Sequence, residues 1–228
     1  MRLGLIVIMI SLFLLGCDNG ELEKLKKENK RLNQSFSGLK EQMISTELMS
    51  RRLTFMNDQI KDIRANIITS KGTITVRFYT DKAPIHVLNF LLLSEGGFYN
   101  GTKFHRVMKG FMIQGGDPNS KDNDPTDDGR GGSTLILPAE FNDIHHGPGI
   151  LSMARGPNPN TARSQFFIMH GDNGSLDEKY SAFGEVVRGM DVVNAIAETK
   201  TSKNDRPLRD VVIKKIEVYR IASKSPGK

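Results

Sequence analysis

The fold is decided by three blocks of sequence: Phe104–Arg106 (FHR), Gly110–Asp117 (GFMIQGGD) and Ser164–Phe167 (SQFF). The blocks interleave large apolar residues with an arginine, with amide side chains and with glycines. A single phenylalanine or methionine usually belongs to a protein core. The alternative is that these apolar residues, which recur with Arg106 and Gln114, form an exposed binding face.

The sequence around these blocks has the periodicity of strands. Apolar and polar residues alternate over residues 67–69 and 73–78, and Lys71-Gly72 between them predicts the turn of a β-hairpin. More short strands are expected farther along the chain. They are placed at residues 104–108, 111–114, 150–154, 165–169 and 183–187, with a closing strand at 211–220.

Two segments of the same region have helical spacing. Pro84 suits the first turn of a helix over residues 85–95, and Gly96-Gly97 ends it. A second helix is expected over residues 190–198. Many short strands, glycine-rich turns and two helices predict a mainly β domain, a barrel whose ends are capped by the helices.

In the order and spacing of the three blocks, the chain resembles the cyclophilin-type peptidyl-prolyl cis-trans isomerases over roughly residues 66–219. The resemblance implies an eight-stranded antiparallel β-barrel with two helices, which agrees with the elements predicted from periodicity. It also implies an isomerase that accelerates rotation about X-Pro bonds in proline-containing polypeptides.

The resemblance assigns the catalytic positions to Arg106, Gln114 and Phe111. Rotation about a peptide bond meets a barrier of ~18–20 kcal/mol because the nitrogen lone pair is delocalised into the carbonyl. A fixed cation that donates a hydrogen bond toward the prolyl nitrogen localises that pair, and arginine stays charged and planar. The reaction transfers no proton, so no nucleophilic triad, metal or organic cofactor is expected.

Further positions match the family's substrate-binding face. Some would form the pocket for the proline ring, and others the neighbouring groove for the residues that precede it. The pocket positions are Met112, Phe167, Leu176 and Tyr180, and the groove positions are Gly129, Ala154, Arg155, Gly156 and Gln165. His105 belongs to the same motif and is also assigned to the substrate-binding set. We expect it to be a structural partner of the arginine rather than an acid or base.

Three positions depart from many eukaryotic members of the family. Ser175 stands where those members have a tryptophan, so strong cyclosporin binding is not expected. Tyr180 replaces a histidine and Arg155 an asparagine, which changes the shape and charge of the groove. Isomerase activity is still expected, since bacterial relatives also carry a tyrosine at the position of Tyr180.

The N-terminus has the pattern of an export signal. A basic start, Met1-Arg2, precedes an apolar run over residues 3–15, and Leu14–Cys17 (LLGC) resembles the lipobox of a bacterial lipoprotein. The run is shorter than the roughly 20 residues of a membrane-spanning helix. We therefore expect removal of residues 1–16 and lipidation of Cys17, including palmitate, while an uncleaved anchor remains the alternative.

A lipid on Cys17 would place the protein on a membrane of the bacterial cell envelope, facing away from the cytoplasm. More than one acyl chain is needed for stable anchoring. Asp18 follows the cysteine and resembles a signal for retention at the inner membrane. The periplasmic face of that membrane is thus expected in a Gram-negative cell.

The segment between the lipobox and the barrel has the composition of a long polar helix. Residues 21–64 contain no proline and a single glycine, and eight of twelve heptad a/d positions are apolar, from Leu22 to Ile60. Polar residues at Asn29, Ser50 and Asn57 weaken the heptad pattern. The pattern leaves two alternatives: a homodimeric coiled coil through residues 22–60, or a single amphipathic helix.

Several other sites are excluded on their residue patterns. The net charge of +6 is spread over the chain without a basic helix that could read bases, so nucleic acid is not an expected partner. The aspartate-rich segment 117–129 lacks the spacing of a calcium loop and predicts a solvated surface insertion. His145-His146 has no further ligand at metal-binding spacing and predicts a polar turn.

The expected domains are a signal peptide (1–16), a lipid-anchored helical stalk (17–65), an isomerase domain (66–222) and a disordered tail (223–228). Such an enzyme would assist the folding of exported or envelope proteins. One rival hypothesis is a module that binds proline segments as a chaperone or scaffold with little turnover. A second is an interaction protein in which residues 18–65 bind the partner and the barrel is a platform.

Overall fold

The computed structural model describes residues 19–60 and 62–221. The chain divides into two units, Met1–Thr54 and Phe55–Lys228, and each is described by itself. The predicted signal peptide, Cys17 and the tail at 223–228 lie outside the described residues. Within the described ranges, no helix has the length and apolar character needed to cross a membrane.

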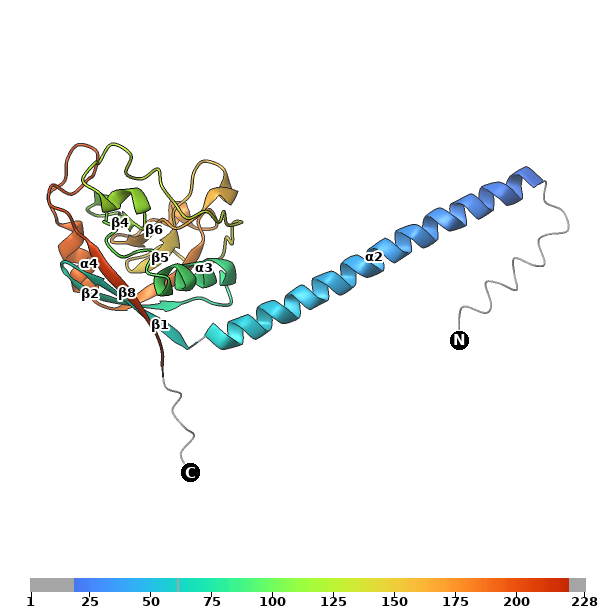
Figure 1. The fold of residues 1–228 in the computed structure, drawn as a ribbon, viewed down its shortest axis with the longest axis horizontal. Helices are drawn as coiled ribbons and strands as arrows, with labels where there is room; N and C mark the ends of the chain where they lie inside the picture. The colour runs from blue at the N-terminus through green and yellow to red at the C-terminus, as the bar shows by residue number, and fades with distance from the viewer. Residues whose placement is uncertain (1–18, 61, 222–228) are drawn as a thin grey trace, which may run out of the picture. The chain divides into compact units, whose positions relative to one another are not determined.

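Residues Asn19–Ile60 form one α-helix, α2 (Figure 1). The segment is free of proline and rich in glutamate, lysine and leucine, residues with high helix propensity. An ion pair between Glu47 and Arg51, one helical turn apart, joins Oε1 and Nη2 at 2.7 Å. Four apolar side chains at successive a/d positions are exposed. They are Leu32, Phe36, Leu39 and Met43.

The second unit is built on one eight-stranded antiparallel sheet in the order β3-β4-β6-β5-β7-β2-β1-β8. The strands are β1 (Ile63–Thr69), β2 (Gly72–Phe78), β3 (Arg106–Met108), β4 (Met112–Gly115), β5 (Ile150–Met153), β6 (Phe166–Met169), β7 (Ala182–Arg188) and β8 (Ile213–Arg220). The predicted mainly β, eight-stranded antiparallel architecture is confirmed.

The sheet curls until the segments beside its two edge strands meet (Figure 1). Lys103, just before β3, forms an isolated antiparallel bridge with Val212, just before β8. The Phe104 amide also donates a hydrogen bond to the Val211 carbonyl at 2.9 Å. Backbone groups next to both edges are therefore paired rather than left open.

The hairpin that opens the sheet differs from its prediction by one residue. Thr69 pairs with Gly72, so the turn is Ser70-Lys71 and not Lys71-Gly72. Gly72 has φ = +139°, which other residues rarely adopt, and a Cβ there would meet a methyl group of Val192 at 2.7 Å. β1 begins at Ile63, so the expected boundary at residue 66 falls inside a strand.

Two helices pack on the sheet, as predicted. α3 (Pro84–Glu95) begins with Pro84 in its first turn, and α4 (Met190–Ala197) follows Gly189. Phe90 of α3 is fully buried among rings from three strands, with centroids 5.3–5.7 Å from those of Phe78, Phe166 and Phe183. Three 3-10 turns complete the elements: η1 (Pro118–Lys121), η2 (Pro159–Thr161) and η3 (Gly174–Leu176).

The alternation of β6 distributes its side chains between two apolar clusters. Phe166 and Ile168 belong to the main core with Phe90, whereas Phe167 and Met169 belong to a second cluster with Met112. All four β6 residues are buried because both faces of this strand are covered. The second cluster supplies the walls of the candidate site.

The segment from Asp117 to Gly129 is not simply the solvated insertion that its aspartates predict. Asp117 is fully buried, and its carboxylate accepts hydrogen bonds from the backbone amides of Asn119 (2.8 Å), Gly129 and Gly131 (3.3 Å). Asp122 and Asp124 are exposed as expected. One buried carboxylate therefore organises the loop, and this role has no signature in the composition.

Candidate active site

The sheet register brings four chemically distinct side chains into one row. Arg106 of β3 lies opposite Gln114 of β4, Gln114 opposite Phe167 of β6, and Phe167 opposite Ser152 of β5. Directly opposed residues on antiparallel strands share a face, with Cβ atoms about 4.5–5.5 Å apart. Positions separated by 61 residues in the sequence, from Arg106 to Phe167, thus become neighbours on one surface.

A cavity of about 230 Å³, the first cavity, lies along this row. This is smaller than the about 300–1,000 Å³ of sites for drug-sized ligands, and it suits a single ring. Six of its nine lining residues carry aromatic or other apolar side chains, and the other three are two arginines and a glutamine. Its lining residues are Arg106, Phe111, Met112, Gln114, Ala154, Arg155, Phe167, Leu176 and Tyr180.

Arg106 is held only loosely at the edge of the first cavity. Its Nε lies 3.6 Å from a carboxylate oxygen of Asp205, and its Nη2 lies 3.2 Å from the sulfur of Met108. Both partners of the ion pair are well exposed, at 45% and 37% of their side-chain surface, so the pair contributes little energy. The guanidinium can therefore turn toward a bound group without losing a strong interaction.

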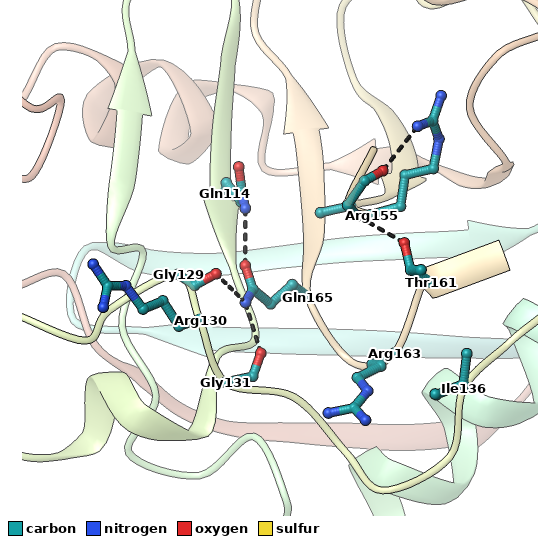
Figure 2. A pocket seen from close by; sticks show the side chains of 11 residues that line it. Gln114, Gly129, Arg130, Gly131, Ile136, Arg155, Thr161, Arg163 and Gln165 are labelled. Atoms are coloured by element: carbon teal, nitrogen blue, oxygen red, sulfur yellow. Dashed lines mark hydrogen bonds between the residues drawn. The ribbon is translucent and has the colours of Figure 1, made fainter. Parts of the chain in front are cut away.

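Gln114 is oriented by a chain of hydrogen bonds. Its Nε2 donates to Oε1 of Gln165 at 2.9 Å, and Nε2 of Gln165 donates to the carbonyls of Gly129 (2.9 Å) and Gly131 (2.7 Å) (Figure 2). Because both amide hydrogens of Gln165 go to backbone carbonyls, its oxygen must face Gln114. The oxygen of Gln114 is thereby presented on the other side, available to a ligand N–H.

A second cavity of about 440 Å³ adjoins the first and shares Gln114, Ala154 and Arg155 with it. The groove residues of the sequence prediction all line it, together with residues that the sequence did not single out. The predicted ones are Gly129, Ala154, Arg155, Gly156 and Gln165, and the added ones are Arg130, Gly131, Ile136, Thr161 and Arg163 (Figure 2).

His105 is the one predicted site residue of the described region that lines neither cavity. Its side chain is buried, and its ring lies 3.7 Å from where a Cβ on Gly129 would stand. Burial lowers the pKa of His105, which keeps the imidazole neutral. Its position behind the wall fits the structural role considered for it and not contact with substrate.

Comparison with known proteins places this geometry in a family. Residues 64–218 match the family described as cyclophilin type peptidyl-prolyl cis-trans isomerase/CLD. The chain belongs to this family. Peptidyl-prolyl cis-trans isomerase-like 1 of Neurospora crassa is 44% identical over 157 residues, covering 67% of this chain and 91% of the relative. The protein of the same description from Mus musculus is 43% identical over 153 residues, covering 64% and 87%.

A solved structure carries the same likeness. The cyclophilin type peptidyl-prolyl cis-trans isomerase of Cryptosporidium parvum, crystallised in the presence of the dipeptide Ala-Pro, superposes with a TM-score of 0.64. It is 32% identical, and the match covers 69% of this chain and 99% of the other. As a cyclophilin-type enzyme, the chain is a peptidyl-prolyl cis-trans isomerase, and cyclophilins bind proline-containing peptides.

Arg155 and Tyr180, the two residues expected to differ from many eukaryotic members of the family, contact each other. The guanidinium of Arg155 lies over the ring of Tyr180, 4.5 Å from its centroid, an attractive cation–π geometry. Tyr180 in turn meets Phe167 edge to face, with centroids 5.8 Å apart. The sequence shows each departure separately, and the contact explains how they are accommodated together.

His145-His146 is more than the polar turn predicted for it. His145 lies between Asp177 and Asp172, with both ring nitrogens 2.7 Å from carboxylate oxygens. His146 is buried, with Nδ1 3.0 Å from Asp177 and Nε2 3.0 Å from the hydroxyl of Ser152. Within residues 19–60 and 62–221, no group of three His, Cys, Asp or Glu side chains is arranged to hold a metal.

Proposed function

We propose that the cyclophilin domain isomerises X-Pro bonds with the proline ring in the first cavity and the guanidinium of Arg106 directed at the prolyl nitrogen. The observation that carries this proposal is the row of Arg106, Gln114 and Phe167 across three adjacent strands. It sets a permanent cation, an amide and an apolar surface side by side.

In this mechanism Phe111, Met112 and Phe167 hold the ring away from water, with Leu176 and Tyr180 opposite. Gln114 fixes the backbone of the substrate. Arg106 donates a hydrogen bond to the prolyl nitrogen as its lone pair localises in the twisted state, which stabilises that state more than either planar form. No covalent bond forms, and no proton leaves the arginine.

The test compares the full chain, purified in detergent, with Arg106→Ala. Removing one preorganised donor typically costs about 10²–10³ in rate, so we expect a loss of that order with peptide affinity changed only slightly. Arg188→Ala is the matched control, because Arg188 is an exposed arginine at the end of β7. A folded parent that binds the peptide without accelerating isomerisation would instead favour the binding chaperone or scaffold.

The enzyme is further proposed to be a bacterial lipoprotein of the cell envelope. Support comes from the apolar run at residues 3–15 and the LLGC motif that ends at Cys17. Extracytoplasmic anchoring, on the periplasmic face of the inner membrane in a Gram-negative cell, would bring the active site to exported proteins. Mass spectrometry should find acyl chains on an N-terminal Cys17, and Cys17→Ser should release the protein from membranes.

Helix α2 would serve as the stalk of this lipoprotein. Its 42 residues give about 60 Å at 1.5 Å per residue, enough to hold an enzyme away from a bilayer. The exposed stripe of Leu32, Phe36, Leu39 and Met43 favours a homodimer through residues 22–60. Sedimentation should show a dimer that becomes monomeric when these four residues are changed to serine. A dimer that persists would contradict this contact.

A further inference from the structure

The second cavity carries an excess of positive charge. Three of its eleven lining residues are arginines, namely Arg130, Arg155 and Arg163, and none is an aspartate or a glutamate. Figure 2 shows their guanidinium groups on three sides of Gln165. Only Arg155 belongs to the predicted binding face, so this concentration of charge is a property that the structure reveals.

Arg155 is fixed in place without being neutralised. Its guanidinium donates to the carbonyls of Gly156 (2.9 Å) and Lys179 (3.0 Å) and lies over Tyr180. Carbonyl groups and an aromatic ring orient a cation but do not cancel its charge. Arg155 therefore presents a fixed positive charge at the boundary between the two cavities, which it lines on both sides.

Arg130 and Arg163 supply two more cations from opposite walls. The stem of Arg163 packs on Gly132, where a Cβ would lie only 2.8 Å from its Cδ. Arg130 follows Gly129, whose carbonyl accepts from Gln165, so its backbone is also anchored. Both side chains are exposed, and no ion pair within the described ranges involves either guanidinium.

Of the five aspartates in the neighbouring loop, none forms an ion pair with Arg130, Arg155 or Arg163 in the part of the chain that the structure describes. Asp117 is buried behind the wall and accepts from the amides of Gly129 and Gly131. Asp128 pairs with Arg206, and Asp127 accepts from the side chain of Asn119 at 2.8 Å. The three arginines that line the second cavity are therefore not paired with these carboxylates and can interact with a ligand.

We propose that the second cavity selects substrates with an acidic side chain, glutamate or aspartate, one or two residues before the proline. This inference rests on the proposed function, because it places the proline in the first cavity. An extended peptide advances about 3.3 Å per residue, which brings its preceding side chains past Arg155 into the second cavity. Ile136 offers apolar surface for the methylene groups of such a side chain.

The test uses peptides that differ only in glutamate or glutamine at each of the two positions before the proline, assayed with the full chain in detergent. Each exposed ion pair is worth about 1.4- to 5-fold in affinity, so we expect at least about a threefold preference for glutamate in kcat/KM at one position. The preference should shrink as salt rises above about 0.15 M, where screening acts within about 8 Å.

The double variant Arg130→Gln and Arg163→Gln removes two of the three cations and should lower the Glu/Gln ratio well below that of the parent. Arg188→Gln with Arg209→Gln removes the same charge from two exposed arginines outside both cavities and should leave the ratio as in the parent. Equal rates for both peptides in the parent would overturn the acidic preference while leaving the isomerase intact. Failure to turn over either peptide would instead count against the proposed function.

Discussion

The imidazole of His146 stacks on the ring of Phe167, with centroids 6.3 Å apart and planes inclined by 26°. Phe167 lines the first cavity, whereas His146 lies behind it, bonded to Ser152 on one side and Asp177 on the other. The ring proposed to hold the proline therefore packs on a hydrogen-bonded chain in which His146 and Ser152 are buried. Its orientation depends on residues that no substrate touches.

Replacing His146 with alanine should loosen Phe167. The change removes the stack and leaves the buried Ser152 hydroxyl without its partner, so we expect a loss of about 2–4 kcal/mol in stability and about tenfold in kcat/KM. Urea unfolding and peptide isomerisation measure the two effects. His145→Ala removes a neighbouring imidazole that does not contact Phe167, and it should spare the rate. Equal rate losses in both variants would refute the backing role.

The two adjacent histidines should affect stability at opposite ends of the pH range. Hydrogen bonds and charges of Asp177 and Asp172 raise the pKa of His145 from 6.5 to about 9. The resulting stabilisation is fully present below pH 6.5 and is lost as pH rises through about 9. Burial lowers the pKa of His146, so its contribution is present above pH 6.5 and is lost as pH falls below it.

Urea unfolding across this pH range tests the assignment. His145→Gln should abolish the decline on the alkaline side, while the decline below pH 6.5 that comes from burial of His146 should persist. All four tyrosines lie within residues 62–221 and the chain has no tryptophan, so near-ultraviolet circular dichroism at the tyrosine band reports tertiary structure around the sheet. An alkaline decline that survives in His145→Gln would show that another group causes it.

Asp117→Ala should destabilise the domain far more than Asp124→Ala in the same loop. Asp117 is buried and satisfies three backbone amides, whereas Asp124 is exposed. A buried amide left unsatisfied costs about 1–3 kcal/mol, and because these three amides are only part-buried, a total near 3 kcal/mol is expected. Because Gly129 and Gly131 carry the carbonyls that hold Gln165, isomerase activity should fall as well. Urea unfolding compares the two variants.

Phe90→Ala tests the core under α3. Its ring is fully buried and contacts four other aromatic rings, so we expect a loss of about 3–5 kcal/mol. Leu92→Ala, two residues along the same helix, changes a side chain that is 59% exposed and should cost little. Comparable losses in the two variants would mean that the helix, and not the ring, determines stability.

Periodicity predicts the elements of the second unit well because each strand and helix has its own local signal. Pro84 places the start of α3, and the alternation in β2 and β8 is visible residue by residue. The turn at Ser70-Lys71 shifted by one residue because Gly72 supplies its positive φ inside the strand rather than in the turn. A glycine in the sequence indicates that the backbone there can have a positive φ. It does not tell whether that glycine lies in the turn or in the strand next to it.

The residues of the candidate site also differ in whether the sequence predicts them. Arg106 and Gln114 are predicted from the resemblance of the sequence blocks to the cyclophilin family, and the register then aligns them. Arg130 and Arg163 carry no local signal, since exposed arginines are common and only the tertiary structure brings the two loops to one cavity. The pairing of His145 with Asp172 and Asp177 joins positions 27 and 32 residues apart, beyond any helical or strand spacing.

The hydrogen bond from the Ile221 amide to the Asp62 carbonyl, 2.9 Å long, joins the two ends of the cyclophilin domain. β1 and β8 enter and leave side by side as a consequence. A domain with adjoining ends is suited to circular permutation or to insertion into a loop of another protein. The strands that carry the candidate site, β3 to β6, lie in the interior of the chain. New segments can therefore be added where the two ends meet without changing the residues of the active site.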